Sequence, residues 1–341
     1  MKIGILTGGG DCPGLNAVIR GVVRMAEGRF GHQILGIRDG WDGLVSDKVE
    51  PVTSSDVSGI LHLGGTILGS SRKNPFKKEE EVKKVEDNLK KHKIDALVAV
   101  GGDDTLGVAH KLNQRGFPCI GVPKTIDNDL NGTDYTFGFN TAVSIATEAI
   151  DRLHSTAEAH NRILVVEVMG RHTGWIAVMS GIAGGADYIV IPEIPVDIAD
   201  ICATVERRKS RGRRFSIIVV AEGARMGGNF ATVADEVDEF GHVRLGGIGH
   251  VLAKEIEKCT QIETRVTILG YVQRGGTPTA FDRVLATRFG VKAAEMVNNR
   301  EFGKMAALRG TEIVAVDLQE ALEKRKEVNQ ELFDIARVFF G

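Results

Sequence analysis

Two charged loops, each placed directly after an apolar run, most constrain what this chain can fold into. The loop 101–105 (GGDDT) follows the run 96–100, and the loop 123–129 (PKTIDND) follows the run 119–122. Both runs are typical of short buried strands, and the stretch 104–115 between them has helical character. The pattern therefore predicts a βαβ unit whose two strands carry the charged loops at their carboxyl ends, where ligands bind in open α/β sheets.

The side chains of these loops indicate a metal–phosphate site with a base beside it. Four carboxylates and one ammonium group fall at the same edge of the predicted sheet: Asp103, Asp104, Asp127, Asp129 and Lys124. Either loop alone is also compatible with an ordinary acidic turn, because Asp and Asn favour turns for local reasons. The presence of both loops in one βαβ unit favours the ligand site.

Strands and helices alternate along the rest of the chain, which predicts mainly parallel sheets covered on both faces. The length of 341 residues suggests about two domains of roughly 150 residues each. Further strands are expected at 3–6, 34–37, 163–168, 188–191, 217–221 and 266–269. Amphipathic helices are expected at 14–27, 79–91, 141–158, 198–208 and 249–258.

Composition excludes several classes of partner. A net charge of −2 favours neither nucleic acid nor an anionic membrane surface. No apolar run approaches the ~20 residues of a membrane span, and the N-terminus enters a strand at once, so a cytoplasmic protein is expected. The four isolated cysteines, Cys12, Cys119, Cys202 and Cys259, are expected to be ordinary buried thiols.

Further motifs carry a resemblance to a known family. They are 7–16 (TGGGDCPGLN), 64–72 (GGTILGSSR), 169–171 (MGR), 221–223 (AEG) and 273–276 (QRGG). With the two charged loops, they resemble the phosphofructokinase A family, which phosphorylates the C1 hydroxyl of fructose 6-phosphate. The resemblance implies two similar three-layer α/β domains, with 1–138 and 254–304 for the phosphoryl donor and 139–253 and 305–341 for the sugar phosphate.

The resemblance also implies the residues on the donor side. Asp127 is the expected general base for the sugar hydroxyl, and Asp129 supports it. Thr125 and Arg171 act on the transferring phosphoryl group. Asp103 is the expected ligand of Mg²⁺, the implied cofactor, because hard oxygen ligands suit this ion. Donor binding and donor specificity are expected at Gly10, Arg72, Asp104 and Lys124.

A second group of residues is implied for the sugar phosphate. In the family, the residues matching Arg162 and Arg265 reach in from a neighbouring subunit, so a homodimer or homotetramer with shared active sites is expected. The full expected set is Thr125, Ile126, Asp127, Arg162, Met169, Gly170, Arg171, Glu222, Arg265, Tyr271, Val272, Gln273 and Arg274.

Asp104 and Lys124 decide the expected donor. ATP-dependent members typically have Gly at both positions, whereas the Asp and Lys pair resembles the pyrophosphate-dependent, mixed-substrate group. The expected reaction is transfer from pyrophosphate to fructose 6-phosphate in glycolysis or gluconeogenesis. Three alternatives remain: an ATP-dependent phosphofructokinase, a relative of NAD or lipid kinases, which have a similar Gly-Gly-Asp loop, and a non-catalytic sugar-phosphate sensor.

Overall fold

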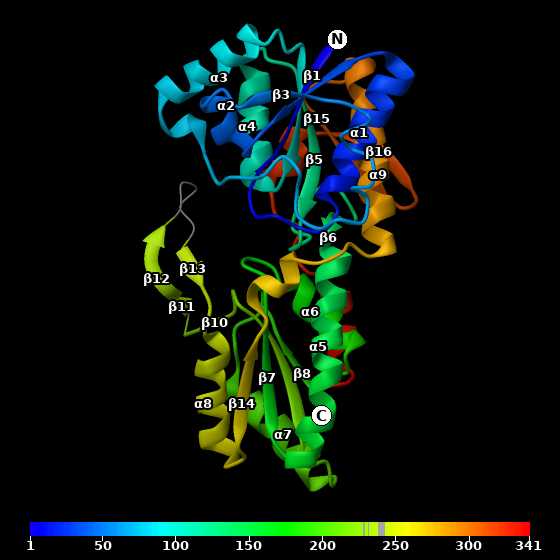
Figure 1. The fold of residues 1–341 in the computed structure, drawn as a ribbon. Helices are drawn as coiled ribbons and strands as arrows, with labels where there is room; N and C mark the ends of the chain where they lie inside the picture. The colour runs from blue at the N-terminus through cyan, green and yellow to red at the C-terminus, as the bar shows by residue number, and fades with distance from the viewer. Residues whose placement is uncertain (228, 231, 238–242) are drawn as a thin grey trace. The chain divides into compact units, whose positions relative to one another are not determined.

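The computed structural model of the chain describes residues 1–227, 229–230, 232–237 and 243–341, and the chain folds into two compact units (Figure 1). Unit 1 contains Met1–Thr141 and Arg274–Arg325. Unit 2 contains Ala142–Val237, Val243–Gln273 and Lys326–Gly341. The chain therefore passes between the units more than once.

An eight-stranded sheet forms the centre of unit 1. Its strand order is β16-β15-β5-β4-β1-β2-β3, with β6 paired to β5, and only the pairs β2–β3 and β15–β16 are antiparallel. The apolar runs become fully buried central strands, as expected for parallel strands with both faces covered. The strands are β1 (Lys2–Thr7), β2 (Gln33–Ile37), β3 (Val49–Val52), β4 (Ala96–Gly101), β5 (Cys119–Thr125), β6 (Phe137–Gly138), β15 (Lys304–Arg309) and β16 (Glu312–Asp317).

Helices pack on both faces of this sheet. On one face α1 and α9 lie side by side (Figure 1), and glycines make the contact close. A Cβ atom on Gly21 would lie 2.8 Å from the carbonyl oxygen of Thr287, and one on Gly290 would lie 2.4 Å from that of Val18. The helices are α1 (Leu15–Phe30), α2 (Gly40–Val45), η1 (Pro75–Lys77), α3 (Glu79–Lys91), α4 (Asp103–Gln114), α9 (Ala280–Asn298) and α10 (Leu318–Glu323).

Unit 2 is built on a smaller, all-parallel sheet. Its strand order is β14-β7-β9-β8, and β7 and β9 are buried along their whole length. Two small antiparallel sheets, β10-β11 and β12-β13, follow β9 in the chain. The strands are β7 (Ile163–Val168), β8 (Tyr188–Val190), β9 (Ser216–Ala221), β10 (Arg225–Met226), β11 (Asn229–Phe230), β12 (Thr232–Val237), β13 (Val243–Leu245) and β14 (Thr264–Ile268).

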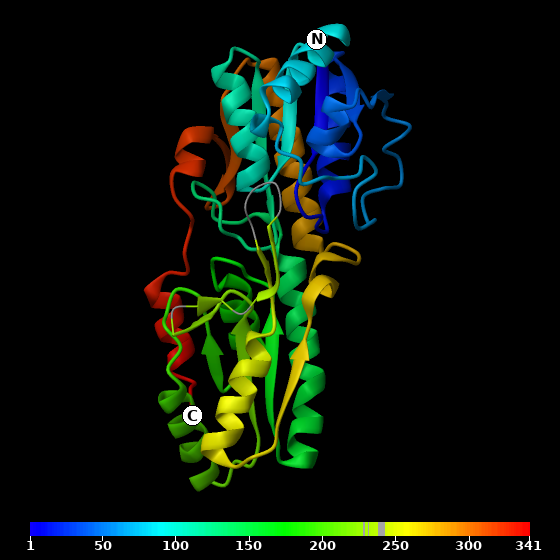
Figure 2. The same cartoon turned by 90° about the vertical axis from the view of Figure 1, so that its left-hand side faces the viewer.

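Helix α8 covers one face of the unit 2 sheet (Figure 2). Its residues Ile248, Leu252 and Ile256 pack in one apolar core with Val165 of β7 and Ile218 of β9. The helices are α5 (Phe139–His160), which begins in unit 1, α6 (Trp175–Ala183), α7 (Ile198–Ser210), α8 (Ile248–Thr260), η2 (Gly270–Arg274) and α11 (Gln330–Arg337).

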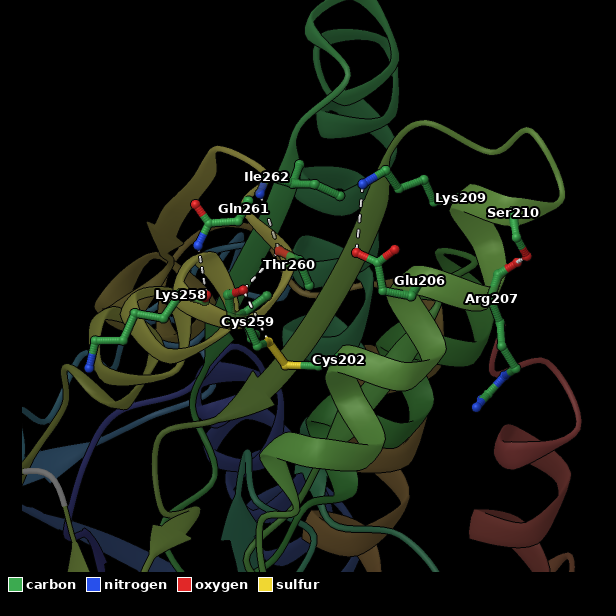
Figure 3. Close-up of polar contacts among 11 residues, drawn as sticks. Cys202, Glu206, Arg207, Lys209, Ser210, Lys258, Cys259, Thr260, Gln261 and Ile262 are labelled. Carbon is green, nitrogen blue, oxygen red and sulfur yellow. Dashed lines mark hydrogen bonds and ion pairs between the residues drawn. A yellow bond between two sulfur atoms is a disulfide. The ribbon is translucent and has the colours of Figure 1, made fainter.

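The expectation for the cysteines is wrong for two of the four. Cys202 of α7 and Cys259 of α8 form a disulfide (Figure 3), and Cys259 is exposed. The sequence carried no signal for this pair, because their separation of 57 residues is bridged only when α7 and α8 pack together. Cys12 and Cys119 are buried free thiols, as predicted, and burial raises the pKa of Cys12 to about 12.

The predicted α/β fold with mainly parallel sheets is confirmed, although the units group the chain differently from the expected division. Residues 254–273 lie in unit 2, because β14 pairs with β7. Residues 305–325 lie in unit 1, because β15 and β16 extend its sheet. The assignment of a donor domain and a sugar-phosphate domain stays a prediction. Among the described helices, none is long and apolar enough to cross a membrane.

Candidate active site

Three loops of unit 1 leave the same edge of its sheet. Strand β4 pairs in parallel with both β1 and β5, so their carboxyl ends lie together. The glycine loop 8–10 follows β1, and the loop with Asp103 and Asp104 follows β4. Lys124 and Thr125 are the last residues of β5, and the loop 126–129 follows them. The backbone N–H of Gly8 donates to the carbonyl of Val100 at 2.9 Å, which ties the first loop to β4.

The glycine loop is narrow, and this shape depends on its missing side chains. A Cβ atom on Gly8 would lie 2.6 Å from the hydroxyl of Thr105 in α4. Gly9 has a left-handed backbone (φ 78°), which Gly adopts without a steric cost, and its N–H donates to the carbonyl of Ser71. This bond brings the segment 64–72 beside the loop, with the exposed side chain of Arg72 directly after it.

Lys124 and Arg274 both reach the glycine loop. The side chain of Lys124 is 3% exposed, and its ammonium group donates to the carbonyl of Gly10. Burial lowers the pKa of Lys124. Arg274 donates to the carbonyl of Asp11 at 3.3 Å, and its Nη1 lies 2.8 Å from where a Cβ atom on Gly10 would stand. The structure therefore places two cationic side chains against the glycine loop, where each donates to a backbone carbonyl.

The carboxylates of Asp103 and Asp104 lie in the first turn of α4, and both residues are half-buried. The N–H of Asp104 donates to Oδ1 of Asp103 at 2.9 Å, and Nη2 of Arg325 lies 3.4 Å from Oδ2 of Asp103. Within the described residues, no group of three or more His, Cys, Asp or Glu side chains is arranged to hold a metal.

The loop after β5 holds Asp127 and Asp129 through local hydrogen bonds. The N–H of Asp127 donates to the hydroxyl of Thr125 at 3.0 Å. Asn128 has a left-handed backbone (φ 53°), and its Oδ1 accepts from the N–H of Thr136. Burial, followed by the negative charges of Asp127 and Asp103, raises the pKa of Asp129. The loop thus gathers carboxylates that favour a proton or a cation.

In unit 2 a second set of predicted residues meets at the carboxyl ends of β7 and β9. Met169, Gly170 and Arg171 follow β7, and Glu222 follows β9 and donates from its N–H to the carbonyl of Val168 at 2.8 Å. Gly170 has φ 136°, and a Cβ atom there would lie 2.7 Å from the carbonyl of Thr173. This close backbone contact fixes the loop that carries Arg171.

The 3₁₀ helix η2 contributes residues of contrasting exposure. Gln273 is fully buried, and its Oε1 accepts from the N–H of Met169 at 3.3 Å. Tyr271 and Val272 are 66% and 60% exposed. Gln273 therefore supports the loop after β7, and the side chain of Met169 in that loop is itself buried.

In unit 1 the side chain of Ile126 is also fully buried, so Ile126 offers a ligand only its backbone.

Arg162 and Arg265 lie at the opposite end of the same sheet from Arg171. Arg162 directly precedes β7, whereas Arg171 lies beyond its far end, and six strand residues at about 3.3 Å each separate them by roughly 20 Å. Arg162 donates from Nε to Oε2 of Glu263 at 2.6 Å, and Arg265 donates to Oε1 of the same carboxylate. Within one chain these arginines do not join the edge that carries Arg171.

The sequence reasoning missed two charged residues beside the predicted site residues. Glu263 holds both Arg162 and Arg265, and its position two residues before Arg265 on a strand end is a weak local signal. Arg325 pairs with Asp103 across 222 residues, and nothing near it in the chain indicates this contact.

Comparisons with known proteins agree on one family. Residues 2–297 match the family model described as Phosphofructokinase. The chain is 56% identical over 343 residues to a Streptomyces coelicolor protein named pyrophosphate–fructose 6-phosphate 1-phosphotransferase, with 100% of both chains covered. It is 52% identical over 343 residues to a Corynebacterium efficiens protein named ATP-dependent 6-phosphofructokinase, covering 100% of this chain and 99% of the relative. The crystal structure of Pichia pastoris phosphofructokinase matches with a TM-score of 0.85 and 33% identity, over 99% of this chain and 36% of that chain.

Proposed function

The chain belongs to the phosphofructokinase family of phosphotransferases, and we propose that it transfers a phosphoryl group from pyrophosphate to the C1 hydroxyl of fructose 6-phosphate. The products are fructose 1,6-bisphosphate and phosphate. The reaction belongs to glycolysis, and its reversibility with pyrophosphate makes it available to gluconeogenesis. We propose a cytoplasmic location with these substrates.

One observation carries the choice of donor: the buried ammonium group of Lys124 lies against the carbonyl of Gly10. Glycine loops at the start of a helix bind phosphate through backbone N–H groups. A lysine ammonium group beside such a loop adds positive charge next to the bound oxygens. Pyrophosphate consists only of phosphate groups, so both of them can interact with this charge. Lys124 also neutralises charge on the phosphate that leaves.

Asp104 supports the same donor by repulsion. Its carboxylate lies in the first turn of α4, one residue after Asp103. A carboxylate about 4 Å from an α-phosphate oxygen costs about 4 kcal/mol at an effective dielectric constant near 20. That cost corresponds to roughly three decades of affinity. A donor without an α-phosphate avoids the repulsion, so Asp104 favours pyrophosphate over a nucleoside triphosphate.

The proposed chemistry is an in-line displacement with Asp127 as general base. The C1 oxygen attacks the terminal phosphorus of pyrophosphate, the bond to the bridging oxygen breaks, and the carboxylate of Asp127 accepts the hydroxyl proton. The hydroxyl of Thr125 accepts from the N–H of Asp127, so its own proton is available to donate to a phosphoryl oxygen. Asp129 supports the position of Asp127, and Arg171 adds positive charge for the transferring oxygens.

The residues present fit Mg²⁺. Oδ2 of Asp103 is a hard oxygen ligand at the edge of the sheet, and Mg²⁺ commonly binds through one or two carboxylates together with substrate phosphates. Asp103 would hold the ion, which when bound neutralises charge on the phosphate oxygens. The absence of a larger ligand cluster among the described residues agrees with an ion that arrives with its phosphates.

We propose that the sugar phosphate binds at the loops after β7 and β9, where Arg171 and Glu222 lie, and that Glu222 accepts a hydrogen bond from a sugar hydroxyl. Because Arg162 and Arg265 lie at the far end of the sheet from Arg171, they serve a bound sugar phosphate only from a second copy of the chain. We therefore propose a homodimer or homotetramer with shared active sites. Arg274, which is also expected to bind the sugar phosphate, lies beside the glycine loop of unit 1.

ATP-dependent phosphofructokinase activity is the second candidate. The observation that favours it is the name of two relatives, since the proteins from Corynebacterium efficiens and Mycobacterium leprae, 52% and 50% identical to this chain, are both named ATP-dependent 6-phosphofructokinase. Overall identity therefore does not separate the donors, and the two residues Asp104 and Lys124 are the basis of the proposal.

A coupled assay of the purified protein with each donor tests the proposal. The wild type should use pyrophosphate with Mg²⁺ and show little activity with ATP. Asp104→Gly should permit detectable ATP use, because it removes a repulsive carboxylate, whereas Lys124→Gly should mainly lose pyrophosphate activity. Efficient wild-type phosphorylation with ATP and poor phosphorylation with pyrophosphate would show that the donor argument is wrong.

A further inference from the structure

Arg325 makes an ion pair with the carboxylate that is expected to bind the metal. Its Nη2 atom lies 3.4 Å from Oδ2 of Asp103. The other oxygen of Asp103, Oδ1, accepts from the N–H of Asp104. Arg325 and a cation bound at Asp103 therefore compete for the same carboxylate oxygen, Oδ2.

Backbone pairing holds Arg325 in place, and its side chain is partly exposed. Arg325 forms an antiparallel bridge with Leu130, directly after Asp129. The amide of Asn131 donates to the carbonyl of Glu320 at 3.1 Å, which holds α10 against the same loop. The side chains of Arg325 and Asp103 are 44% and 42% exposed, so water screens their attraction and the ion pair is weak.

A second carboxylate lies within the field of this guanidinium group. The positive charge of Arg325 acts to lower the pKa of Asp129, against the larger effects of burial and of the neighbouring acids. Arg325 thus offsets repulsion between Asp103 and Asp129. Guanidinium groups bind phosphate as well as carboxylate, through the same planar set of N–H donors.

We propose that Arg325 is a donor-binding residue that neutralises Asp103 and Asp129 before the Mg²⁺–donor complex binds, and then pairs with the phosphate oxygens of the donor. The inference rests on the proposed function, because it takes the donor to be a magnesium-bound phosphate. In this exchange the metal replaces the guanidinium group at Oδ2 of Asp103, and the guanidinium group pairs with a phosphate oxygen of the donor.

Binding measurements on the intact protein test this exchange, with Mn²⁺ alone as a spectroscopic probe for the metal and magnesium methylenediphosphonate as a donor that does not turn over. Arg325→Gln should bind Mn²⁺ about two- to fivefold more tightly, because a weak competing ion pair is gone. The same variant should bind magnesium methylenediphosphonate about tenfold more weakly, because a charge-assisted hydrogen bond is gone. Loss of a merely structural contact would weaken both.

Two further variants serve as controls. Arg325→Lys keeps the charge and should bind Mn²⁺ like the wild type. Arg309→Gln removes an exposed guanidinium group of unit 1 that pairs with Glu320 instead, and it should change neither measurement. The inference is overturned if Arg325→Gln binds both probes less tightly, or if either probe binds it as it binds the wild type.

The outcome also separates this inference from the proposed donor. A wild-type protein that binds a magnesium-bound, non-hydrolysable ATP analogue in preference to methylenediphosphonate would contradict pyrophosphate as the donor. The opposite changes in metal and donor affinity would then be measured with the ATP analogue. If the wild type prefers methylenediphosphonate and Arg325→Gln leaves both affinities unchanged, only the role of Arg325 is wrong.

Discussion

The two units distribute their charged residues in different ways. Unit 1 brings its candidate residues to one edge of its sheet, where Lys124 is buried and the loops after β1, β4 and β5 are tied to one another. Unit 2 divides its candidates between both ends of its sheet, with Arg171 at one end and Arg162 at the other. Under the proposed function, unit 1 would assemble a donor site by itself, whereas unit 2 would need a second chain to complete a sugar-phosphate site.

The largest expected effect comes from removing the proposed base in unit 1. Asp127→Ser should lower kcat by about 10²–10⁴-fold, the usual weight of general acid–base catalysis, because no group accepts the hydroxyl proton. The KM for fructose 6-phosphate should change much less. Steady-state kinetics with pyrophosphate measure both values.

The exposed Asp87 of α3 offers a matched control, since Asp87→Ser removes a carboxylate of the same unit away from the loops. That variant should keep wild-type kinetics. A kcat near the wild-type value in Asp127→Ser would remove Asp127 from the mechanism, and it would leave unit 1 as a binding site without a base.

A smaller effect should follow from breaking the arginine pair of unit 2. Arg162→Ala should raise the KM for fructose 6-phosphate by about 10- to 100-fold, the weight of a hydrogen bond between charged groups. At a fructose 6-phosphate concentration far below the raised KM, both Arg162→Ala and Asp127→Ser subunits should have little activity, and mixing them should restore part of it, because a mixed oligomer contains some sites with both residues intact.

Mass spectrometry of the mixture shows whether subunits have exchanged, and Arg152→Ala, which removes an exposed arginine of α5, is the control for lost charge. If exchanged subunits stay inactive, Arg162 does not serve a neighbouring chain. Unit 2 would then differ from unit 1 in its layout but not in its dependence on a partner.

The smallest expected effect is on stability, at Asp129 of unit 1. Because the pKa of Asp129 is raised, the folded protein binds this proton more tightly than the unfolded chain does. Folding therefore loses stability as pH rises through the raised value and regains it as pH falls. Asp129→Asn should increase the free energy of unfolding by about 1 kcal/mol at about pH 8.

Denaturant unfolding at several pH values checks this, and the gain should shrink as the pH falls below the raised value, where the wild-type carboxyl is protonated. An equal gain at every pH would mean that the substitution acts through packing instead of charge. The repulsion between the acidic side chains of unit 1 would then be smaller than their arrangement indicates.

Much of the fold was predictable because its central strands are continuous apolar runs. The strand at 163–168 was predicted with the bounds of β7, and the helix at 79–91 with those of α3. Helix α9 was not predicted, because its nonpolar residues are not confined to one face: Phe281 and Val284 are exposed, whereas other nonpolar residues are buried against α1 and the sheet. The β15–β16 hairpin was missed too, although its turn at Gly310 and Thr311 was a readable signal.

The candidate site was predictable only in its local parts. Gly10 and Lys124 lie in motifs that indicate phosphate binding. Their contact, however, depends on the parallel pairing of β1, β4 and β5. The pair formed by Arg325 and Asp103 depends on the path of the last part of the chain over the loop after β5. Such long-range contacts leave no periodic pattern, so the structure was needed to find them.

The Cys202–Cys259 bond makes a closed covalent ring of the chain between α7 and α8 (Figure 3). The ring includes β9, Glu222 and the two small antiparallel sheets that follow. A single protease cut anywhere inside it opens the ring without separating the chain into two molecules. The two pieces of a nicked chain would stay joined until a reducing agent is added, and after a cut between Glu222 and Cys259 the strand that leads to Glu222 would be attached to α8 through the disulfide alone.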